Sequence, residues 1–166
     1  MKNIILVGFM GTGKTAVGKA LAVRLGMKFF DMDDIIEERE GMKISDIFEK
    51  KGEPYFRHAE KMVAKDIAIQ SGLVVAAGGG AMVDEENVKS FKSSGVIFCL
   101  VATPDKIFER TKGHTHRPLL NVSDPKEKIS ELLAKRAEYY ARADYRIDTT
   151  DLSINEVVDK IAGYLK

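Results

Sequence analysis

The sequence predicts an α/β fold, a three-layer sandwich in which helices cover both faces of a five-stranded parallel sheet. Five short segments are apolar along most of their length instead of alternating, which is typical of strands buried on both faces. Longer stretches with helical periodicity separate these segments, and parallel neighbours need such a helix-length crossover. The expected strands are residues 3–7, 28–31, 73–77, 96–101 and 145–148.

A helix is expected between the first two strands, because apolar residues recur there every four positions. A glycine follows, as is common where a helix ends in a left-handed residue. These residues are Val17, Leu21, Leu25 and Gly26. A second helix is expected to begin at Ile35, with Asp34 as its N-cap and Glu37 three residues later.

Prolines and a capping box mark three later helices. Pro54 opens a helix that is predicted to close at Gly72, because proline is favoured in the first helical turn. Pro125 opens another helix in the same way. The inward-facing stripe of that helix comprises Ile129, Leu132, Leu133, Arg136 and Tyr140. Ser153 begins the last helix, and Glu156 three residues later completes a capping box.

Composition restricts the class of protein. The 166 residues fit one domain spanning 1–166, and 45% apolar with 31% charged residues excludes disordered and low-complexity chains. A balance of 26 Lys and Arg against 25 Asp and Glu lacks the broad positive field of sequence-independent nucleic-acid binding. No segment approaches the ~18 apolar residues of a membrane span. The lone Cys99 allows no intrachain disulfide, so we expect a buried thiol in a reducing cytoplasm.

A phosphate loop is predicted directly after the first strand. Residues 8–15 match the pattern Gly, four residues, Gly, Lys, then Ser or Thr. The match lies between an apolar strand and an amphipathic helix, so backbone N–H groups can surround a phosphate chain at a helix N-terminus. We expect Lys14 to neutralise the β and γ phosphates of a nucleotide and Thr15 to hold Mg²⁺. The alternative is a glycine-rich turn with a solvated lysine.

An acidic pair follows the second strand. Asp31 and Asp33 are two residues apart, and ligands of open α/β sheets gather beyond the carboxyl ends of the strands. We expect Asp31 to face the metal ion. For Asp33, capping the next helix is the alternative to a role in the site.

Two arginines are predicted to bind one small anion. Arg136 falls on the apolar stripe of its helix, and a buried guanidinium needs an anionic partner. Arg57, at the head of another helix, is the second candidate. Snorkelling or a structural ion pair is the alternative for both. Gly78, Gly79 and Gly80 follow the third strand and allow a ligand close to the backbone, unless they form only a flexible turn.

A basic, irregular stretch at about 111–124 is expected to form a mobile lid. Such a loop can close over transferring phosphates, exclude water and bring Arg117 to the developing charge. His114 and His116 without a third ligand make a poor metal site, so we expect solvated histidines there.

Together these segments resemble the shikimate kinase family, and the resemblance covers essentially the whole chain. It is carried by residues 8–15, 31–33, 52–57, 78–81, 117–120 and 135–137, with Glu60, Arg110 and Tyr140. The resemblance implies a P-loop kinase-like fold and transfer of the ATP γ-phosphoryl group to the 3-hydroxyl of shikimate, in the synthesis of aromatic amino acids. It also implies a substrate-binding segment at about 32–61.

The resemblance further implies roles for individual residues. Arg57 and Arg136 would bind the shikimate carboxylate, while Asp33 and Gly79 would hold its hydroxyls. Asp33 also suits a base beside the attacking hydroxyl. The expected catalytic residues are therefore Lys14, Asp33 and Arg117.

For the nucleotide, the resemblance implies Arg110 against adenine and Arg117 against the phosphates. The expected ATP-binding residues are Gly11, Thr12, Gly13, Lys14, Thr15, Ala16, Arg110 and Arg117. Many relatives carry a second hydroxyl residue where this chain has Ala16. Because the backbone N–H there can still donate, we expect a modest effect on nucleotide affinity.

Two other functions remain open from the sequence. Another small P-loop kinase, acting on gluconate or a nucleoside monophosphate, would share the phosphate loop, but those substrates lack the carboxylate and triol that two arginines and Asp33 suit. The other is a non-enzymatic nucleotide-binding switch. The GTPase patterns Asp-x-x-Gly and Asn-Lys-x-Asp do not occur after the phosphate loop. One domain without a spare apolar helix face favours a monomer.

Overall fold

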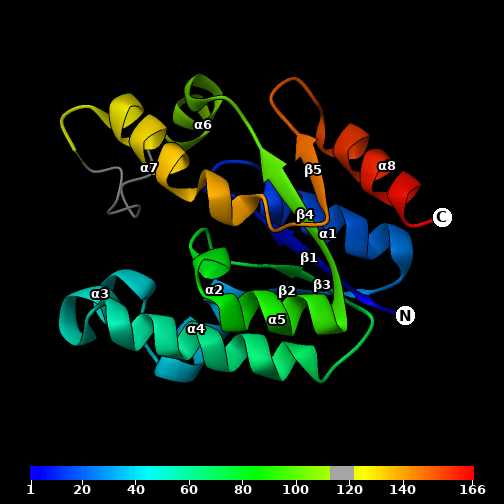
Figure 1. The fold of residues 1–166 in the computed structure, drawn as a ribbon, viewed down its shortest axis with the longest axis horizontal. Coiled ribbons are helices and arrows are strands. Elements are labelled where there is room, and N and C mark those ends of the chain that lie inside the picture. The colour runs from blue at the N-terminus through cyan, green and yellow to red at the C-terminus, as the bar shows by residue number, and fades with distance from the viewer. Residues whose placement is uncertain (113–121) are drawn as a thin grey trace.

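The computed structural model describes residues 1–112 and 122–166, and in them a five-stranded parallel sheet lies between two layers of helices (Figure 1). The strands are β1 (Asn3–Val7), β2 (Lys28–Asp31), β3 (Leu73–Ala76), β4 (Gly95–Val101) and β5 (Tyr145–Asp148). Their order across the sheet is β2-β3-β1-β4-β5, and each neighbouring pair is parallel. The predicted α/β class is confirmed. The strand bounds agree to within one residue, since β3 ends one residue early and β4 begins one residue early.

At least one helix separates each strand from the next, as a parallel sheet requires, and three helices lie between β2 and β3. The described helices are α1 (Lys14–Leu25), α2 (Met32–Glu40), α3 (Ile44–Lys51), α4 (Glu53–Ala68), α5 (Glu85–Ser94), α6 (Pro104–Thr111), α7 (Pro125–Tyr140) and α8 (Ile154–Tyr164), with a 3₁₀ turn η1 (Ala81–Val83). Gly26 ends α1 in the left-handed conformation, with a φ of 64°. Ser153 and Glu156 form the predicted capping box of α8. None of these described helices is long and apolar enough to cross a membrane.

The predicted start of the second helix is wrong. α2 begins at Met32 and not at Ile35, because its N-cap is Asp31 instead of Asp34. The Asp31 Oδ1 accepts a hydrogen bond from the Asp33 N–H at 2.9 Å and satisfies one of the free donors of the first turn. Asp33 therefore lies inside the helix and is not its cap.

The predicted end of α4 is also wrong. The helix stops at Ala68 and does not continue to Gly72. The side-chain amide of Asn3 donates to the carbonyl oxygens of Ile67 at 3.2 Å and Gln70 at 3.0 Å. β1 therefore adds a side-chain donor to the carbonyl groups at this helix end, beside the Gln70 N–H, which donates to the Ile67 carbonyl at 3.0 Å.

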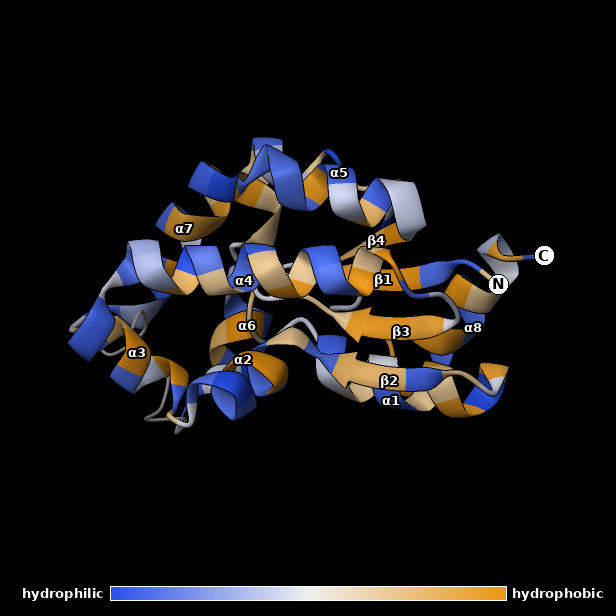
Figure 2. Cartoon of the chain, turned by 90° about the horizontal axis from the view of Figure 1, so that it is seen from below, coloured by the Kyte–Doolittle hydropathy of each residue, from blue (hydrophilic) through white to orange (hydrophobic). Residues whose placement is uncertain are grey.

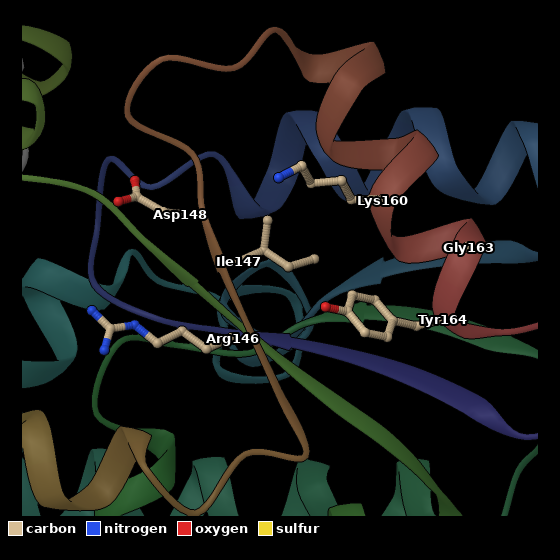
Figure 3. A pocket seen from close by; sticks show the side chains of 6 residues that line it. All are labelled: Arg146, Ile147, Asp148, Lys160, Gly163 and Tyr164. Carbon is tan, nitrogen blue, oxygen red and sulfur yellow. The ribbon is translucent and has the colours of Figure 1, made fainter.

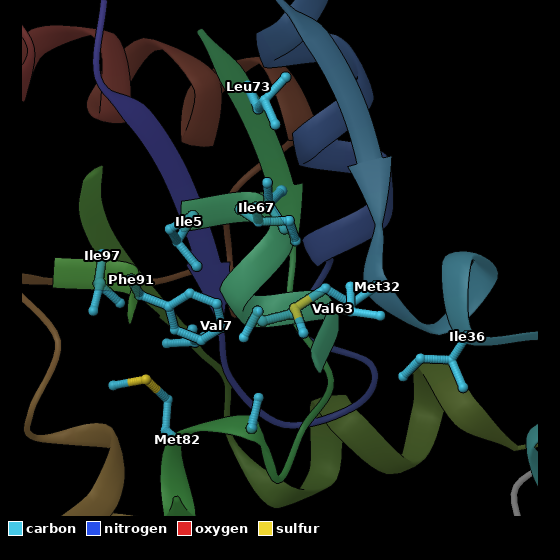
Figure 4. Close-up of a cluster of buried hydrophobic side chains, with 14 of the residues drawn as sticks. Ile5, Val7, Met32, Ile36, Val63, Ile67, Leu73, Met82, Phe91 and Ile97 are labelled. Atoms are coloured by element: carbon cyan, nitrogen blue, oxygen red, sulfur yellow. The ribbon is translucent and has the colours of Figure 1, made fainter. Parts of the chain in front are cut away.

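Each face of the sheet has its own hydrophobic core (Figure 2). α1 and α8 cover one face, and α4 and α5 cover the other. Figure 4 shows side chains of the second core, among them Ile5, Val63 and Phe91. Alternate residues of β1 supply both cores: Leu6 faces the first, while Ile5 and Val7 face the second. The apolar character of the strands on both sides is therefore explained by burial on both sides. Cys99 is buried as predicted, at 1% exposure.

The carboxyl ends of all the described strands lie along one edge of the sheet, because the strands run in the same direction. Backbone pairing continues beyond the strands at this edge. The Ala77 N–H donates to the Leu6 carbonyl at 2.9 Å, and the Thr149 N–H donates to the Val101 carbonyl at 2.8 Å. The segments that follow β1, β2, β3 and β5 are thereby brought together.

Candidate active site

The phosphate loop, residues 8–15, turns between β1 and the N-terminus of α1. Gly8 has a φ of 135°, and a Cβ there would stand 2.2 Å from the Leu100 carbonyl oxygen, so only glycine fits. Thr12 donates its hydroxyl hydrogen to the Phe9 carbonyl at 2.7 Å. Lys14 Nζ donates to the carbonyls of Gly8 at 2.7 Å and Phe9 at 3.0 Å. The Lys14 ammonium therefore lies against the loop that carries it.

Arg110 and Thr149 connect this loop to the end of β5. Arg110 Nη1 donates to the Gly11 carbonyl and to Thr149 Oγ1, both at 3.1 Å, and its Nη2 donates to the Thr149 carbonyl at 2.9 Å. The Thr149 hydroxyl, which is buried, donates to the Thr12 carbonyl at 3.0 Å. These bonds engage the carbonyl groups of Gly11 and Thr12 in the loop. No sequence pattern predicts Thr149, because its partner lies 137 positions away.

Thr15 and Asp31 place two oxygen atoms together beside the loop. The Thr15 hydroxyl donates to Asp31 Oδ2 at 3.0 Å. The other carboxylate oxygen of Asp31 caps α2, which fixes the direction of the carboxylate. Hydroxyl and carboxylate oxygens are the ligands that Mg²⁺ prefers, so this pair fits a magnesium ion held with phosphate oxygens.

The glycine triplet, residues 78–80, has two buried carboxyl groups beside its first residue, those of Glu60 and Asp33. A Cβ on Gly78 would stand 2.9 Å from Glu60 Oε2 and 3.2 Å from Asp33 Oδ1. Neither oxygen is accessible to solvent, and neither has a hydrogen-bond partner among the described residues. Because unpaired buried acceptors are costly, this pair of oxygens is suited to a ligand that brings hydroxyl donors.

Two guanidinium groups lie against the other two glycines. A Cβ on Gly79 would stand 3.1 Å from Arg136 Nη1, and one on Gly80 would stand 2.7 Å from Arg57 Nη2. The Gly79 Cβ position is also 3.7 Å from the Gly8 carbonyl oxygen, so the triplet adjoins the phosphate loop. The structure thus brings together Asp33, Arg57, Gly79 and Arg136, as the sequence predicts for one small anion with hydroxyl groups.

Arg57 is held by a buried carboxylate. Its Nη1 lies 3.0 Å from Glu60 Oε1, and the Glu60 side chain is 1% exposed. The pKa of Glu60 is raised above its ordinary value, because the effect of burial is larger than the opposing effect of the adjacent Arg57 guanidinium. The ion pair, which was the alternative interpretation for Arg57, is thus present alongside the contact with the triplet, and it orients the guanidinium.

Arg136 is supported differently. Its guanidinium carbon lies 5.5 Å from the centroid of the Phe9 ring, and no carboxylate in residues 1–112 or 122–166 forms an ion pair with it. The aromatic ring favours a cation at this position without neutralising it. An anionic ligand would therefore meet a guanidinium whose charge is not already compensated.

Asp33 has the most strongly perturbed carboxyl group of the site. Burial, and next the charge of Asp31, raise the pKa of Asp33 to about 6, although Lys14 acts in the opposite direction. A carboxyl group with a pKa near neutrality can accept a proton from a hydroxyl and release it again near physiological pH. Its position between the phosphate loop and the glycine triplet suits that task.

Arg117, an expected site residue, lies outside the described residues, as do His114 and His116, for which the sequence predicts exposure to solvent. Ala16 is exposed in the first turn of α1. A cavity of about 400 Å³ opens between β5 and α8 (Figure 3), and it is lined by Arg146, Ile147, Asp148, Lys160, Gly163 and Tyr164. None of the expected site residues within the described ranges lines that cavity.

Comparison with known proteins adds an independent line of evidence. The family model for shikimate kinase matches residues 10–166. A shikimate kinase from Thermodesulfovibrio yellowstonii is 52% identical over 97% of this chain and 93% of its own length. One from Persephonella marina is 45% identical over the full length of both chains.

The fold comparison agrees. The structure of shikimate kinase from Acinetobacter baumannii in complex with shikimate superposes with a TM-score of 0.95. It is 38% identical to this chain, and the match covers 99% of this chain and 93% of that one. Sequence and structure therefore point to the same family.

Proposed function

Because this chain belongs to the shikimate kinase family, it transfers a phosphoryl group from ATP to an alcohol oxygen of shikimate, and we propose how its own residues perform this reaction. One observation carries the proposal. Two guanidinium groups and two carboxyl groups approach the glycine triplet directly beside the phosphate loop, which suits an acid with several hydroxyls next to a triphosphate.

We propose that the carboxylate of shikimate is bound by Arg57 and Arg136. Glu60 compensates the charge of Arg57, whereas the charge of Arg136 is not compensated by a described carboxylate. The two guanidinium groups together therefore favour a ligand with a single negative charge. Asp33 and the backbone of Gly79 then hold the hydroxyl groups. The free acceptor on Asp33 Oδ1 supports this assignment, because a hydroxyl would satisfy it.

The nucleotide binds at the phosphate loop in this proposal. Backbone N–H groups of residues 11–16 surround the phosphates, and Lys14 neutralises charge on the β and γ groups. Arg110 lies against adenine, and Arg117 reaches the phosphates from a lid at about 111–124. The bonds from Arg110 to Gly11 and Thr149 support its place at the nucleotide side of the site.

Thr15 and Asp31 would hold Mg²⁺, which neutralises developing charge on the phosphate oxygens when it is bound. Asp33 accepts the proton of the 3-hydroxyl as that oxygen attacks the γ-phosphorus, and the bond between this phosphorus and the bridging oxygen breaks, so that ADP leaves. Lys14 and Arg117 stabilise the charge on the transferring group. Since phosphoryl transfer requires little covalent chemistry from the protein, alignment of the two substrates supplies most of the remaining rate enhancement.

The test is a measurement of ADP release with shikimate, with gluconate, with a nucleoside monophosphate and without any acceptor. We expect release only with shikimate, and ³¹P NMR should identify the product as shikimate 3-phosphate. Equal release with gluconate or without an acceptor would reject the assignment of the acid site. We further propose a cytoplasmic monomer, for which light scattering should give a mass near 18.4 kDa.

A further inference from the structure

We propose that Tyr140 is a positioning residue for the acid substrate: it holds the peptide group between Gly79 and Gly80, so that this peptide and Arg136 face the same ligand. The proposal rests on the proposed function, because it concerns the same acid site. It goes beyond it by giving a task to a side chain that touches neither nucleotide nor acid in that scheme.

A hydrogen bond between α7 and the glycine triplet supports this role for Tyr140. The Tyr140 hydroxyl donates to the Gly79 carbonyl at 2.6 Å and joins the end of α7 to the loop after β3, across 61 positions of sequence. Apart from this bond, the Gly79–Gly80 peptide has no side chain of its own to hold it. The Ala81 N–H donates to the Gly78 carbonyl at 3.0 Å and closes a turn around this peptide. Because glycine has the widest conformational freedom of any residue, the bond from Tyr140 adds a restraint on the orientation of the central peptide.

This bond also sets the direction of an N–H group. The peptide is trans, so the Gly80 N–H points opposite to the Gly79 carbonyl and away from Tyr140. Within residues 1–112 and 122–166, no acceptor receives a hydrogen bond from the N–H of Gly79 or Gly80. Anchoring the carbonyl therefore leaves a free donor with a defined direction beside Arg57, whose guanidinium lies against Gly80.

Arg136 and Tyr140 are one turn apart on α7, so they lie on the same face of the helix. One helix thus supplies a guanidinium next to Gly79 and the hydroxyl that fixes the neighbouring peptide. Both groups are carried by α7, so the Arg136 guanidinium and the Gly79–Gly80 peptide are positioned by the same helix. A carboxylate can then receive hydrogen bonds from both without reordering the loop.

The phenol remains a donor over the working pH range. Burial raises the pKa of Tyr140 to about 12, although the nearby Arg136 guanidinium acts in the opposite direction. The ring itself packs with Phe9 and Ile129 and with the core on the face of the sheet that α4 and α5 cover. Tyr140→Phe keeps this ring and removes only the hydroxyl, so it separates positioning from packing.

The experiment compares the full-length wild type with Tyr140→Phe and with Tyr139→Phe. Tyr139 is the neighbouring tyrosine of α7, and its hydroxyl makes no hydrogen bond to any residue that the structure describes. Calorimetry measures the Kd of shikimate and of ADP separately, and a coupled assay measures kcat and both KM values. Thermal unfolding measures Tm for all three proteins.

We expect Tyr140→Phe to raise the Kd and KM of shikimate by about fivefold to tenfold, the size of one lost hydrogen bond. The Kd of ADP should stay within twofold of the wild type, and Tyr139→Phe should match the wild type throughout. An unchanged shikimate Kd would overturn the proposal. Equal weakening of shikimate and ADP would also overturn it, because it would indicate a general structural role.

A second measurement does not depend on the variant folding. In ¹⁵N-labelled wild type, the Gly80 amide resonance should shift when shikimate is added, and Tyr140→Phe, where folded, should broaden it. If the Gly80 amide resonance of the wild type does not shift when shikimate is added, the inference is overturned even if Tyr140→Phe is unfolded. If the wild type itself fails to bind shikimate, the proposed function is rejected. If the wild type binds shikimate and Tyr140→Phe binds it equally well, only the role of Tyr140 is rejected.

Discussion

Arg57 Nη1 lies 3.0 Å from Glu60 Oε1, one turn further along α4, and the Glu60 side chain is 1% exposed. The carboxylate that orients this guanidinium is thus closed off from water. Arg136, which lies against Gly79, rests on the Phe9 ring and has no such partner among the described residues. The two arginines therefore differ in what their removal leaves behind.

We expect Arg57→Ala and Arg136→Ala each to raise the shikimate Kd by at least about tenfold, because each removes a charged hydrogen bond to a carboxylate. Only Arg57→Ala should also lower the free energy of unfolding, by about 1–2 kcal/mol at pH 7, since it leaves Glu60 buried and unpaired. Calorimetry with and without nucleotide measures the first effect, and urea unfolding the second.

That stability loss should shrink as pH falls and Glu60 takes up a proton. Equal loss of stability in the two variants would contradict the difference between their surroundings. An unchanged shikimate affinity in either variant would contradict its assignment to the carboxylate.

Lys14→Met should lower kcat by about 100-fold or more while leaving the fold intact, because it removes charge stabilisation from the transferring phosphoryl group. Lys19→Met, an exposed lysine on the same helix, is the matched control and should be neutral. Circular dichroism verifies folding, and the coupled assay measures kcat. Full turnover in folded Lys14→Met would exclude the proposed role.

The raised pKa of Asp33 predicts that activity depends on pH. Its pKa is raised to about 6, and it must be ionised to accept a proton, so kcat/KM should increase as pH rises through about 6. Asp33→Asn should lose about 100-fold or more of kcat and should not show this step. A wild-type profile that is flat from pH 5 to pH 8 would argue against Asp33 as the base.

The same shift predicts an effect on stability with a defined sign. The ordinary pKa of an aspartate side chain is 3.8, and that of Asp33 in the folded chain is about 6, so the folded chain binds more protons between these values. The contribution of Asp33 to the free energy of unfolding is therefore present below pH 3.8 and is lost as pH rises through about 6. Asp33→Asn should raise the free energy of unfolding by about 2 kcal/mol at pH 7.5 and should have little effect near pH 4, as measured by urea titration.

Thr149→Val should weaken nucleotide binding, because Thr149 is bonded to Thr12 in the phosphate loop and to Arg110. We expect the KM of ATP to rise by about threefold to tenfold and the KM of shikimate to stay constant. Thr150→Val removes hydrogen bonds to Asp148 and Thr103, outside the loop, and serves as the control. Equal effects of the two variants would show that the link to the loop is unimportant.

Gly80→Ala tests the close approach of Arg57. Gly80 has a φ of −102°, which alanine tolerates, so the added methyl group acts only by displacing the guanidinium that lies 2.7 Å away. We expect severalfold weaker shikimate binding with little loss of stability. Gly163→Ala, where no atom lies within 4 Å, should instead stabilise α8 by about 0.5–1 kcal/mol and leave binding unchanged. Calorimetry and thermal unfolding distinguish the two.

Local patterns in the sequence determined the strands, several helix ends and the phosphate loop. Apolar runs identify β1 to β5 because burial on both faces acts on every residue of a strand. The capping box of Ser153 and the turn at Gly26 are formed by residues close together in the chain. The expectation that failed at α2 involved a choice among neighbouring aspartates, each of which could cap a helix.

Only the tertiary structure decided which distant groups meet. The bonds from Asn3 to the end of α4, from Thr149 to Thr12, and from Tyr140 to Gly79 each join segments more than 60 positions apart. They depend on the order of the strands and on the packing of helices across them, which no local pattern records. The chain by itself specified the residue types that an acid and a triphosphate need, and the parallel sheet brought them to one edge.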